Sequence, residues 1–307
     1  MPEIIATFRD LGYDRAYFRR FKERRLETVG SLAELKSIQS HWGSSKVAFV
    51  PTMGALHDGH LALVRQAKAL ADKVVVSIFV NPIQFGPKED FAKYPRTVEA
   101  DSQLLRSVGA DALFLPTAAM MYPEGFQTYV YNKDMANILC GARRVGHFEG
   151  VLTVVAMLLN MAAPSVAIFG KKDYQQWRLI ETMVRDLHLP YTVLGANTVR
   201  EADGLAMSSR NRYLDAGARD QARFIYRGLV AADQAYGRGT RDVAALLAHF
   251  KNCVAAVPQL EIEYVEVLTQ KDLKPPKPGM PEPAVIIAAC HLAGVRLIDN
   301  LELGQPA

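Results

Sequence analysis

Two histidines three residues apart stand where the chain could bind an anion. His57 and His60 follow the apolar run Val47–Val50 and a glycine-containing turn, and they precede the amphipathic segment Leu61–Ala71. A strand that feeds a helix through such a turn aims unpaired backbone N–H groups and the positive end of the helix at one place. Histidines three apart face the same way on a helix, and Gly59 lets a nucleotide approach closely. The segment therefore predicts a phosphate site.

The histidine pair has two other interpretations. It could form half of a metal site, or it could be a structural feature of the helix start. A metal site usually needs a third histidine, cysteine or carboxylate ligand, and the sequence offers no obvious one. Phosphate binding is the interpretation that we favour.

Two further polar segments could bind a charged ligand. Gly170-Lys-Lys-Asp173 follows one apolar run, and Ser208-Ser-Arg210 follows the next one along the chain. Taken alone, the first could be a charged helix start and the second a polar loop. Both come after predicted strands, however, on the carboxyl side of the sheet where open α/β folds bind ligands. This placement favours a binding role for both segments.

The elements that must position these residues alternate along the chain. From Lys46 onward, short β-branched runs alternate with longer amphipathic segments, which is typical of crossover helices between parallel strands. The expected fold class is α/β, with a Rossmann-like, doubly wound parallel sheet. Strands are expected at Val47–Val50, Val74–Val80, Ala112–Leu115, Val166–Phe169 and Tyr191–Leu194. Helices are expected at His60–Ala71, Thr97–Val108, Val151–Ala163 and Asp173–Leu187, the last with a buried face formed by Trp177, Ile180, Val184 and Leu187.

The pattern changes after Thr198, which predicts a smaller C-terminal α+β domain. Two helical stretches are followed by alternating apolar segments, in the order Asp215–Tyr236, Arg241–Val257, Ile262–Leu268 and Val285–Leu301. The expected domains are a basic N-terminal extension over residues 1–25, a nucleotide-binding domain over 26–198 and the smaller domain over 199–307. The extension could be a solvated helix or an arm that binds an anion or a partner.

Composition excludes several classes of protein. The net charge of +4 over 307 residues suits an enzyme of anionic nucleotides but does not predict a nucleic-acid partner. Three widely spaced cysteines support neither a disulfide framework nor a zinc site, so a reducing cytoplasm is expected. The most apolar stretch, from Val151 to Phe169, is divided by Asn160 and Pro164 into a helix and a strand, so no membrane span is expected.

Five ordered sequence blocks resemble the pantothenate synthetase family, which belongs to the His-x-Gly-His nucleotidyltransferase superfamily. The first is Pro51-Thr-Met-Gly-Ala-Leu-His-Asp-Gly-His60, which is far more specific than His-x-Gly-His alone. The others are Val80-Asn-Pro-Ile-Gln-Phe-Gly86 with Tyr94-Pro-Arg96, Arg144-Val-Gly-His-Phe148 with Gly150-Val-Leu-Thr153, Phe169-Gly-Lys-Lys-Asp-Tyr-Gln-Gln176, and Thr198 to Tyr213. The resemblance runs from about Glu27 to the end and is weaker after Leu214.

The resemblance implies an ATP-dependent condensation of (R)-pantoate with β-alanine to pantothenate, AMP and pyrophosphate. A carboxylate oxygen is a poor leaving group, so the acid is first converted to a pantoyl-adenylate, which the amine then attacks. The substrates are small molecules, and Mg²⁺ is expected to accompany ATP on its phosphate oxygens without a named protein ligand. A cytoplasmic homodimer is expected, with neither a nucleic acid nor a membrane as partner.

The resemblance also implies roles for individual residues. His60 is the expected proton donor, and His60, His57, Lys172 and Arg210 form the expected catalytic set. ATP contacts are expected from Met53, Gly54, Ala55, Leu56, His57, Asp58, Gly59, His60, Gly170, Lys171, Lys172, Asp173, Val199, Met207, Ser208, Ser209 and Arg210. Gln84 and Gln176 are expected to bind pantoate, with Met53 and Phe79 as apolar neighbours. Buried glutamines could equally satisfy backbone groups, and we favour the ligand role. Gln84 is also expected to bind β-alanine, with Asn81, Tyr94, Arg144 and His147 as further candidates.

The chain departs from the family pattern at two positions beside these residues. Lys171 stands where the family usually has glutamate, and Val145 stands where it usually has proline. Two alternatives to the ligase activity are an adenylyltransferase of the same superfamily that acts on a phosphate acceptor, and a non-catalytic nucleotide-binding paralogue. The neutral amides of Gln84 and Gln176 disfavour a phosphate acceptor, and retention of the catalytic set disfavours the paralogue.

Overall fold

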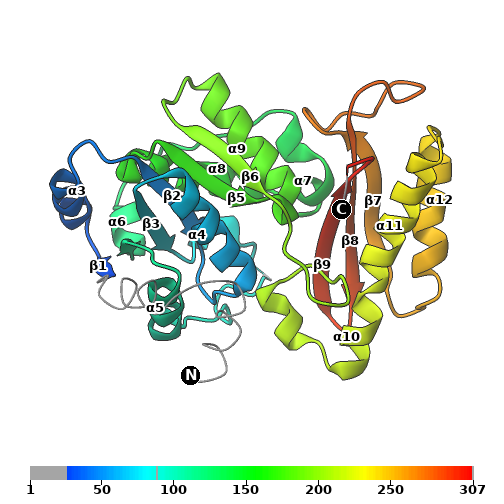
Figure 1. Ribbon diagram of the computed structural model, residues 1–307, viewed down its shortest axis with the longest axis horizontal. Coiled ribbons are helices and arrows are strands. Elements are labelled where there is room, and N and C mark those ends of the chain that lie inside the picture. Colours follow the sequence, from blue (N-terminus) through cyan, green and yellow to red (C-terminus); the bar gives the residue numbers. More distant parts are fainter. Residues whose placement is uncertain (1–25, 88, 306–307) are drawn as a thin grey trace, which may run out of the picture.

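The computed structural model describes residues 26–87 and 89–305. The predicted basic extension over residues 1–25 therefore lies outside the described residues. Figure 1 shows two units side by side: a large sheet flanked by helices, and a small sheet with α11 and α12 on its outer face. In the described ranges, no helix is long and apolar enough to cross a membrane.

The large unit is built on a six-stranded sheet in which every neighbouring pair is parallel. The strand order is β1-β4-β3-β2-β5-β6. The strands are β1 (Glu27–Val29), β2 (Val47–Thr52), β3 (Lys73–Ile78), β4 (Ala112–Phe114), β5 (Val166–Gly170) and β6 (Thr192–Ala196). All five predicted strands are present, which confirms the α/β class.

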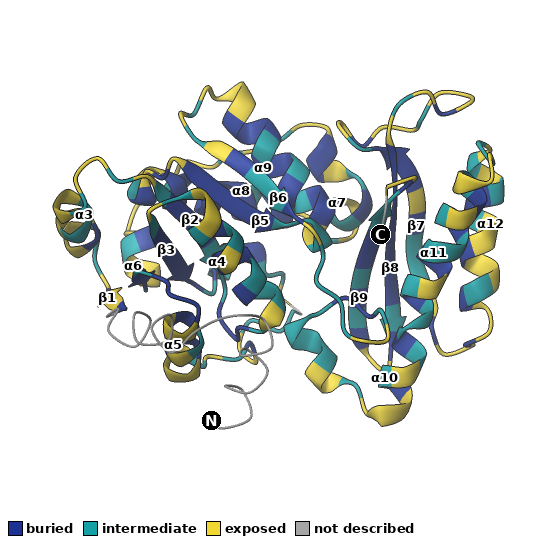
Figure 2. Ribbon diagram, in the orientation of Figure 1, coloured by how far each residue is buried: buried dark blue, intermediate teal, exposed yellow. Residues whose placement is uncertain are grey.

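Helices cover both faces of this sheet because successive strand residues point to opposite sides. On β2, Phe49 packs into one apolar core, while Ala48 and Val50 belong to another. The first core includes α3 (Leu32–His41), α8 (His147–Ala162) and α9 (Tyr174–Asp186), and the second includes α4 (Asp58–Leu70) and α5 (Val98–Ser107). The sheet is therefore doubly wound, as predicted. Figure 2 shows the strands dark blue between helices that are yellow on their outer sides.

The order in which strands are added to the sheet reverses between β2 and β5. From β2 the sheet continues outward through β3 to β4, whereas from β5 it continues in the other direction to β6. Such a switch point leaves a crevice at the carboxyl ends of the two central strands, because the following loops diverge. This is where ligands bind in open α/β sheets.

The second unit is smaller and combines helices with an antiparallel sheet. Its sheet has the order β7-β8-β9, and α11 and α12 share an apolar core with one side of it. The other side contributes Val285 and Ile287 to the core of α8 and α9, so the two units pack directly together. The elements are α10 (Ala216–Ala222), α11 (Phe224–Gly237), α12 (Val243–Val254), β7 (Glu261–Thr269), β8 (Ala284–Leu292) and β9 (Val295–Glu302). The domain boundary between residues 198 and 199 stays a prediction.

The structure differs from the sequence-based expectation in a few elements. β1 and α3 were not predicted, and the short helices α6 (Ala118–Met121) and α7 (Leu139–Arg143) were also missed. The segment Val285–Leu301 is two strands, because Ala293 and Gly294 both take positive φ angles, of 49° and 75°, and form a turn. Leu187 was wrongly assigned to the buried face of α9: it follows the last helical residue and is 52% exposed.

Candidate active site

A cavity of about 230 Å³ opens at the carboxyl ends of β2 and β5. It brings together most of the residues that the sequence predicted to bind ligands, from segments far apart in the chain. The predicted residues that line it are Met53, His57, Gly59, His60, Phe79, Asn81, Gln84, Tyr94, Gly170, Lys172, Asp173, Gln176, Val199, Met207, Ser208, Ser209 and Arg210. Gly54, Ala55, Leu56, Asp58 and Lys171 do not line it.

A second cavity of about 790 Å³ continues from the first one. The two share Lys172, Gln176 and Arg210 among their lining residues. The second cavity extends between the units, with Arg144 on one wall and Arg296 on another. Together the two cavities reach the upper part of the volume range of small-molecule sites, which is about 300–1,000 Å³.

The two histidines lie against each other at the first turn of α4. Their ring centroids are 4.1 Å apart, as the three-residue spacing predicted. The backbone N–H of His57 points to Nδ1 of His60 at 3.4 Å, which favours the tautomer with the proton on Nε2. Burial, reinforced by the nearby His57, lowers the pKa of His60 to about 3, and burial also lowers the pKa of His57, with Lys172 adding to the effect. Both rings are therefore neutral hydrogen-bond donors at neutral pH in the absence of a bound anion.

Gly59 is required by the histidine beside it. A Cβ atom at this position would lie 2.9 Å from the ring of His57, closer than real Cβ contacts. The glycine thus leaves room for the His57 ring at the start of α4. The Nδ1 atom of His57 is buried and, among the described residues, has no hydrogen-bond partner.

The turn before these histidines is held by Asp101, a residue of α5. Its buried carboxylate accepts hydrogen bonds from the backbone N–H of Ala55 at 3.0 Å and of Leu56 at 2.8 Å. Gly54 and Ala55 both have positive φ angles, of 82° and 51°, so the turn is tight and needs external support. Thr97 donates to the same carboxylate at 3.1 Å. Sequence reasoning missed Asp101, because its partners are far from it along the chain.

Lys172 is carried by a short 3₁₀ helix (Lys171–Asp173) between β5 and α9. This places it at the carboxyl end of a central strand, beside the start of a helix. Lys171 points elsewhere: its Nζ lies 2.8 Å from Oε2 of Glu302, on β9. The positive charge at this departure from the family pattern is thus matched by an acidic partner.

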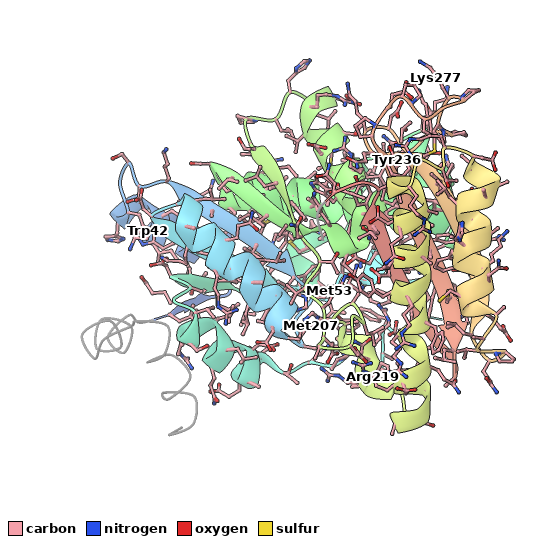
Figure 3. The ribbon with its side chains drawn as sticks, turned by 45° about the vertical axis from the view of Figure 1, so that its right-hand side comes forward. Trp42, Met53, Met207, Arg219, Tyr236 and Lys277 are labelled. Atoms are coloured by element: carbon pink, nitrogen blue, oxygen red, sulfur yellow. The ribbon has the colours of Figure 1, made fainter. Side chains whose placement is uncertain are left out.

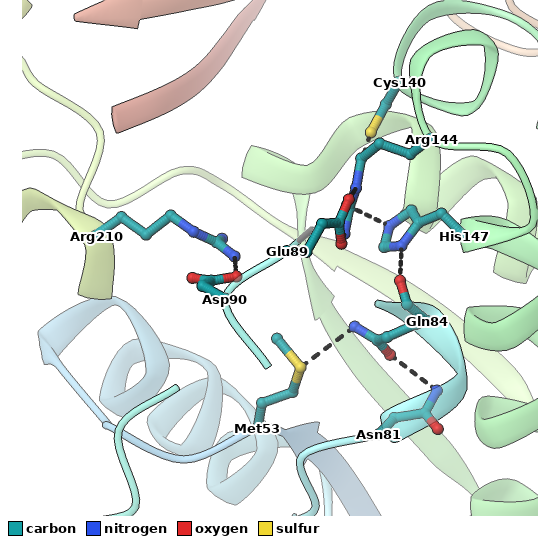
Figure 4. Close-up of polar contacts among 9 residues, drawn as sticks. All are labelled: Met53, Asn81, Gln84, Glu89, Asp90, Cys140, Arg144, His147 and Arg210. Atoms are coloured by element: carbon teal, nitrogen blue, oxygen red, sulfur yellow. Dashed lines mark hydrogen bonds and ion pairs between the residues drawn. The ribbon is translucent and has the colours of Figure 1, made fainter. Parts of the chain in front are cut away.

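Gln84 is fixed within the cavity by several partners. Its Nε2 lies 3.2 Å from the sulfur of Met53, and its Oε1 accepts from Asn81 at 3.0 Å (Figure 4). Asn81 in turn accepts from the hydroxyl of Tyr122 at 2.6 Å. A Cβ atom on Gly150 would collide with the backbone of Gln84 at 2.8 Å, so the glycine lets α8 approach closely. Tyr122 was not identified from the sequence.

Gln176 and its neighbour Gln175 have different partners. Gln176 lines the first cavity, as predicted. Gln175 instead donates to the carbonyls of Met135 and Ile138, both at 2.8 Å, and accepts from the N–H of Cys140 at 3.1 Å. A glutamine that satisfies backbone groups does occur here, but it is the adjacent residue.

His147 and Arg144 form a hydrogen-bonded group beside Gln84 (Figure 4). Nδ1 of His147 lies 2.8 Å from the carbonyl oxygen of Gln84, and Nε2 lies 2.8 Å from Arg144. Arg144 makes two hydrogen bonds to Glu89, at 2.7 and 2.6 Å. Burial, reinforced by the Arg144 charge, lowers the pKa of His147 to about 4. Tyr94 lines the first cavity, and burial raises its pKa.

The segment after β6 closes the first cavity from the side of the second unit. Met207 and Met53, both labelled in Figure 3, line the cavity. Ser208 and Ser209 are lining residues as well, and Arg210 pairs with Asp90 at 3.2 Å. Both charged groups of this pair are partly exposed, so the pair is weak and Arg210 can exchange Asp90 for another anion.

The described residues contain no cluster of three or more histidine, cysteine, aspartate or glutamate side chains that could hold a metal ion. The cavity instead combines neutral imidazoles, a lysine, an arginine and hydroxyl groups. These are donors to an anion with several oxygens. The geometry therefore fits a polyphosphate next to a pocket lined by amides.

Comparison with known proteins shows which family the chain belongs to. Residues 27–302 match the model of the pantoate-beta-alanine ligase family. The chain belongs to this family. It is 50% identical over 284 residues to the pantothenate synthetase of Magnetococcus marinus, an alignment that covers 92% of this chain and 98% of that protein.

Solved structures of the ligase family have the same fold. The crystal structure of pantothenate synthetase from Thermus thermophilus has a TM-score of 0.85 at 44% identity, covering 90% of this chain and 99% of that one. The structure of pantoate-beta-alanine ligase from Francisella tularensis, complexed with β-γ ATP and β-alanine, has a TM-score of 0.76 at 33% identity, covering 92% and 99%.

Proposed function

We propose that the chain condenses pantoate with β-alanine, using ATP and passing through a pantoyl-adenylate. The observation that carries this proposal is the adjacency of two kinds of donor in one cavity. His57, His60 and Lys172 form the anion-binding part, and Gln84 and Gln176 form a neutral amide part. Adenylation of an acid requires an ATP phosphate and a carboxylate side by side, and this cavity supports that arrangement.

In the first step, a pantoate carboxylate oxygen attacks the α-phosphorus of ATP. A phosphorus–oxygen bond forms, the α–β bridge breaks and pyrophosphate leaves with its electron pair. Negative charge gathers on the phosphate oxygens, so catalysis here is chiefly positioning and electrostatic stabilisation. Mg²⁺ enters as part of the ATP substrate, on phosphate oxygens, because this ion keeps several waters and needs few protein ligands.

The donors of the first step are His60, Lys172 and Arg210. Neutral His60 donates from Nε2 to a phosphate oxygen, and an approaching phosphate raises its depressed pKa, so that it can also carry a proton. Lys172 supplies a point charge at the end of β5. Arg210 leaves Asp90 and binds phosphate oxygens through its planar guanidinium.

In the second step, the amine of β-alanine attacks the acyl carbon of the adenylate. An amide bond forms, the acyl–oxygen bond breaks, AMP leaves and the amine loses a proton. Gln84 lies between the two acids in this scheme, held by Asn81 and by His147. The guanidinium of Arg144 lines the second cavity near His147 and is a candidate partner for the β-alanine carboxylate.

A cytoplasmic location and a homodimer remain predictions from the family resemblance. The three cysteines are free, which is compatible with a reducing compartment. Light scattering coupled to size-exclusion chromatography tests the dimer directly. A monomer at micromolar concentration would contradict it.

The experiment that tests the activity measures pyrophosphate and AMP release from ATP, with Mg²⁺ and pantoate, in the presence and absence of β-alanine. AMP turnover that needs both acids, with pantothenate as product, is the expected result. Pyrophosphate release without pantoate, but with a phosphomonoester, would indicate the adenylyltransferase activity instead. ATP binding without turnover would indicate a non-catalytic paralogue.

A further inference from the structure

The last strand of the chain makes specific contacts with the segment that carries Lys172. Nδ2 of Asn300, on β9, donates to the backbone carbonyl of Lys171 and to that of Lys172, both at 2.9 Å. One buried amide group thus binds two consecutive carbonyls of the 3₁₀ helix. Because a 3₁₀ helix of three residues has few hydrogen bonds of its own, these bonds help to fix the orientation of the peptide units on either side of Lys172.

An ion pair adds a second contact between the same elements. Nζ of Lys171 lies 2.8 Å from Oε2 of Glu302, and the hydroxyl of Tyr174 donates to Oε1 of Glu302 at 3.0 Å. Lys171 also lies over the ring of Trp177, 5.3 Å from its centroid. The side chains of Lys171 and Glu302 are about four-fifths buried, at 20% and 19% exposure, so this pair is screened less than a surface pair.

The same strand also binds the segment after β6. Arg200 makes two hydrogen bonds, of 2.6 and 3.0 Å, to the buried carboxylate of Asp299 and a third, of 3.2 Å, to the carbonyl of Asn300. Arg200 directly follows Val199, which lines the first cavity. Asp299, Asn300 and Glu302 therefore hold both chain segments that border the cavity on the side of β5 and β6.

We infer that β9 is a positioning element for adenylation, in which Asn300 and the Lys171–Glu302 ion pair set the placement of Lys172. The inference rests on the proposed function, since it assigns these residues to the same reaction. Lys171 and Glu302 line neither cavity, so they act through the backbone and not by touching the substrate. A shift of about 1 Å in a catalytic group can lower a rate by about 10². Loss of the contacts should therefore reduce the rate of adenylation.

A charge swap separates positioning from general stability. Lys171→Glu and Glu302→Lys each place like charges together, whereas the double variant restores an ion pair of reversed sign. The control is Lys68→Glu, because Lys68 pairs with Asp111 at the same distance of 2.8 Å and at similar burial, in the last turn of α4. Glu302→Gln is a milder variant in case a charge reversal prevents folding, and Asn300→Asp tests the two hydrogen bonds to the backbone carbonyls.

The measured quantities are kcat and KM for ATP in pantoate-dependent pyrophosphate release, at a temperature well below the melting temperature of every variant. We expect kcat to fall about tenfold in Lys171→Glu and in Glu302→Lys, and to lie within about threefold of the wild type in the double variant. Lys68→Glu should have a lower melting temperature and an unchanged kcat. Asn300→Asp should lose kcat as well, since a carboxylate cannot donate to the two carbonyls.

The outcomes are distinguishable from a failure of the proposed function. The wild-type rate tests the function, and the ratio of variant to wild type tests the inference. If the wild type released no pyrophosphate, the affinity for ATP would be measured by titration calorimetry in place of the rate. The single variants should then lose affinity by a similar factor, and the double variant should regain it. Wild-type kcat and KM in folded single variants, or no recovery in the double variant, would overturn the positioning role.

Discussion

Gln175 and Gln176 are consecutive residues of α9, yet Gln175 binds three backbone groups at and beside the start of α7 while Gln176 lines the cavity. The helix turns by about 100° per residue, so adjacent side chains leave it in different directions. This pair offers a matched test of binding against structure. Substitution of either residue by alanine removes the same kind of side chain from the same turn of the helix.

Gln176→Ala should raise KM for pantoate by about tenfold, which corresponds to the loss of one net hydrogen bond to the substrate. The KM for ATP should change much less, because the phosphate donors lie elsewhere in the cavity. Steady-state kinetics with each substrate varied in turn measures both constants.

Gln175→Ala is the matched control. It leaves two carbonyls and one N–H without their partner, which should lower the free energy of unfolding by about 3 kcal/mol. Urea unfolding measures this loss. If Gln175→Ala changed KM for pantoate as much as Gln176→Ala did, the assignment of Gln176 to the pantoate pocket would be wrong.

His60→Ala should lower the rate of pyrophosphate release by about 10², the scale of losing one donor to developing charge. The effect should appear in kcat, since the donor acts on the phosphate as it reacts. His249→Ala is the control, because His249 is exposed on α12, away from the cavity. A rate within threefold of the wild type for His60→Ala would remove this histidine from the mechanism.

The binding segments could be predicted from the sequence because their signals are local. His57 and His60 lie in one turn after a recognisable strand, and Lys172 and Arg210 follow two others. Since the carboxyl ends of parallel strands meet at one edge, the prediction of the sheet placed these residues together. The structure brings all four to the same cavity.

The supporting residues could not be predicted because their partners are distant in sequence. Asp101 binds the turn at Ala55 from another helix, and Asn300 binds Lys172 from the last strand. Neither residue belongs to a local pattern, since an aspartate on an amphipathic helix and an asparagine in a strand look like ordinary polar positions. Strand β1 was missed for a related reason: with three residues, it is too short to show alternation.

Asp101→Asn should destabilise the turn at Ala55 and impair the use of ATP. The amide group replaces one acceptor oxygen with a donor that faces the N–H of Ala55 or Leu56, so a hydrogen bond to a charged acceptor is lost. Such bonds contribute about 1.5–3 kcal/mol, and the free energy of unfolding should fall by a similar amount. Denaturant unfolding, together with KM for ATP, measures the two effects.

A change at Asp101 that reduced stability and left KM for ATP unaltered would contradict the role of the turn in placing His57. Glu99→Gln serves as the control, because Glu99 lies on the same helix and its side chain contacts only the exposed Gln103 among its hydrogen-bond partners in the described residues. Its stability and kinetics should match those of the wild type.

The free energy of unfolding should fall as the pH decreases below about 6.5. The pKa values of His60 and His147 are lowered to about 3 and about 4 by burial, whereas an unfolded histidine titrates near 6.5. Between these values the unfolded chain binds more protons than the folded one, so stability present above pH 6.5 is lost on acidification. The slope approaches about 1.4 kcal/mol per pH unit for each histidine.

Urea unfolding of the ATP-free protein at several pH values from 7.5 to 4.5 measures this slope. His147→Gln removes one titrating group, so its curve should be flatter than that of the wild type over this range. The neighbouring charges of Arg144 and Glu89 are unchanged in the variant. Parallel curves for the two proteins would show that His147 does not supply the predicted dependence.

Asp90→Asn should tighten ATP binding by about two- to fivefold. In the structure Asp90 pairs with Arg210 at 3.2 Å, and this pair must break before Arg210 can bind phosphate (Figure 4). A partly exposed ion pair contributes at most about 1 kcal/mol, which sets the size of the gain. Glu89→Gln removes the same charge from the neighbouring residue, but Glu89 pairs with Arg144. Titration calorimetry with ATP should show a lower Kd for Asp90→Asn than for Glu89→Gln. Removal of a negative charge alone would lower the Kd of both variants equally, whereas competition for Arg210 acts only through Asp90.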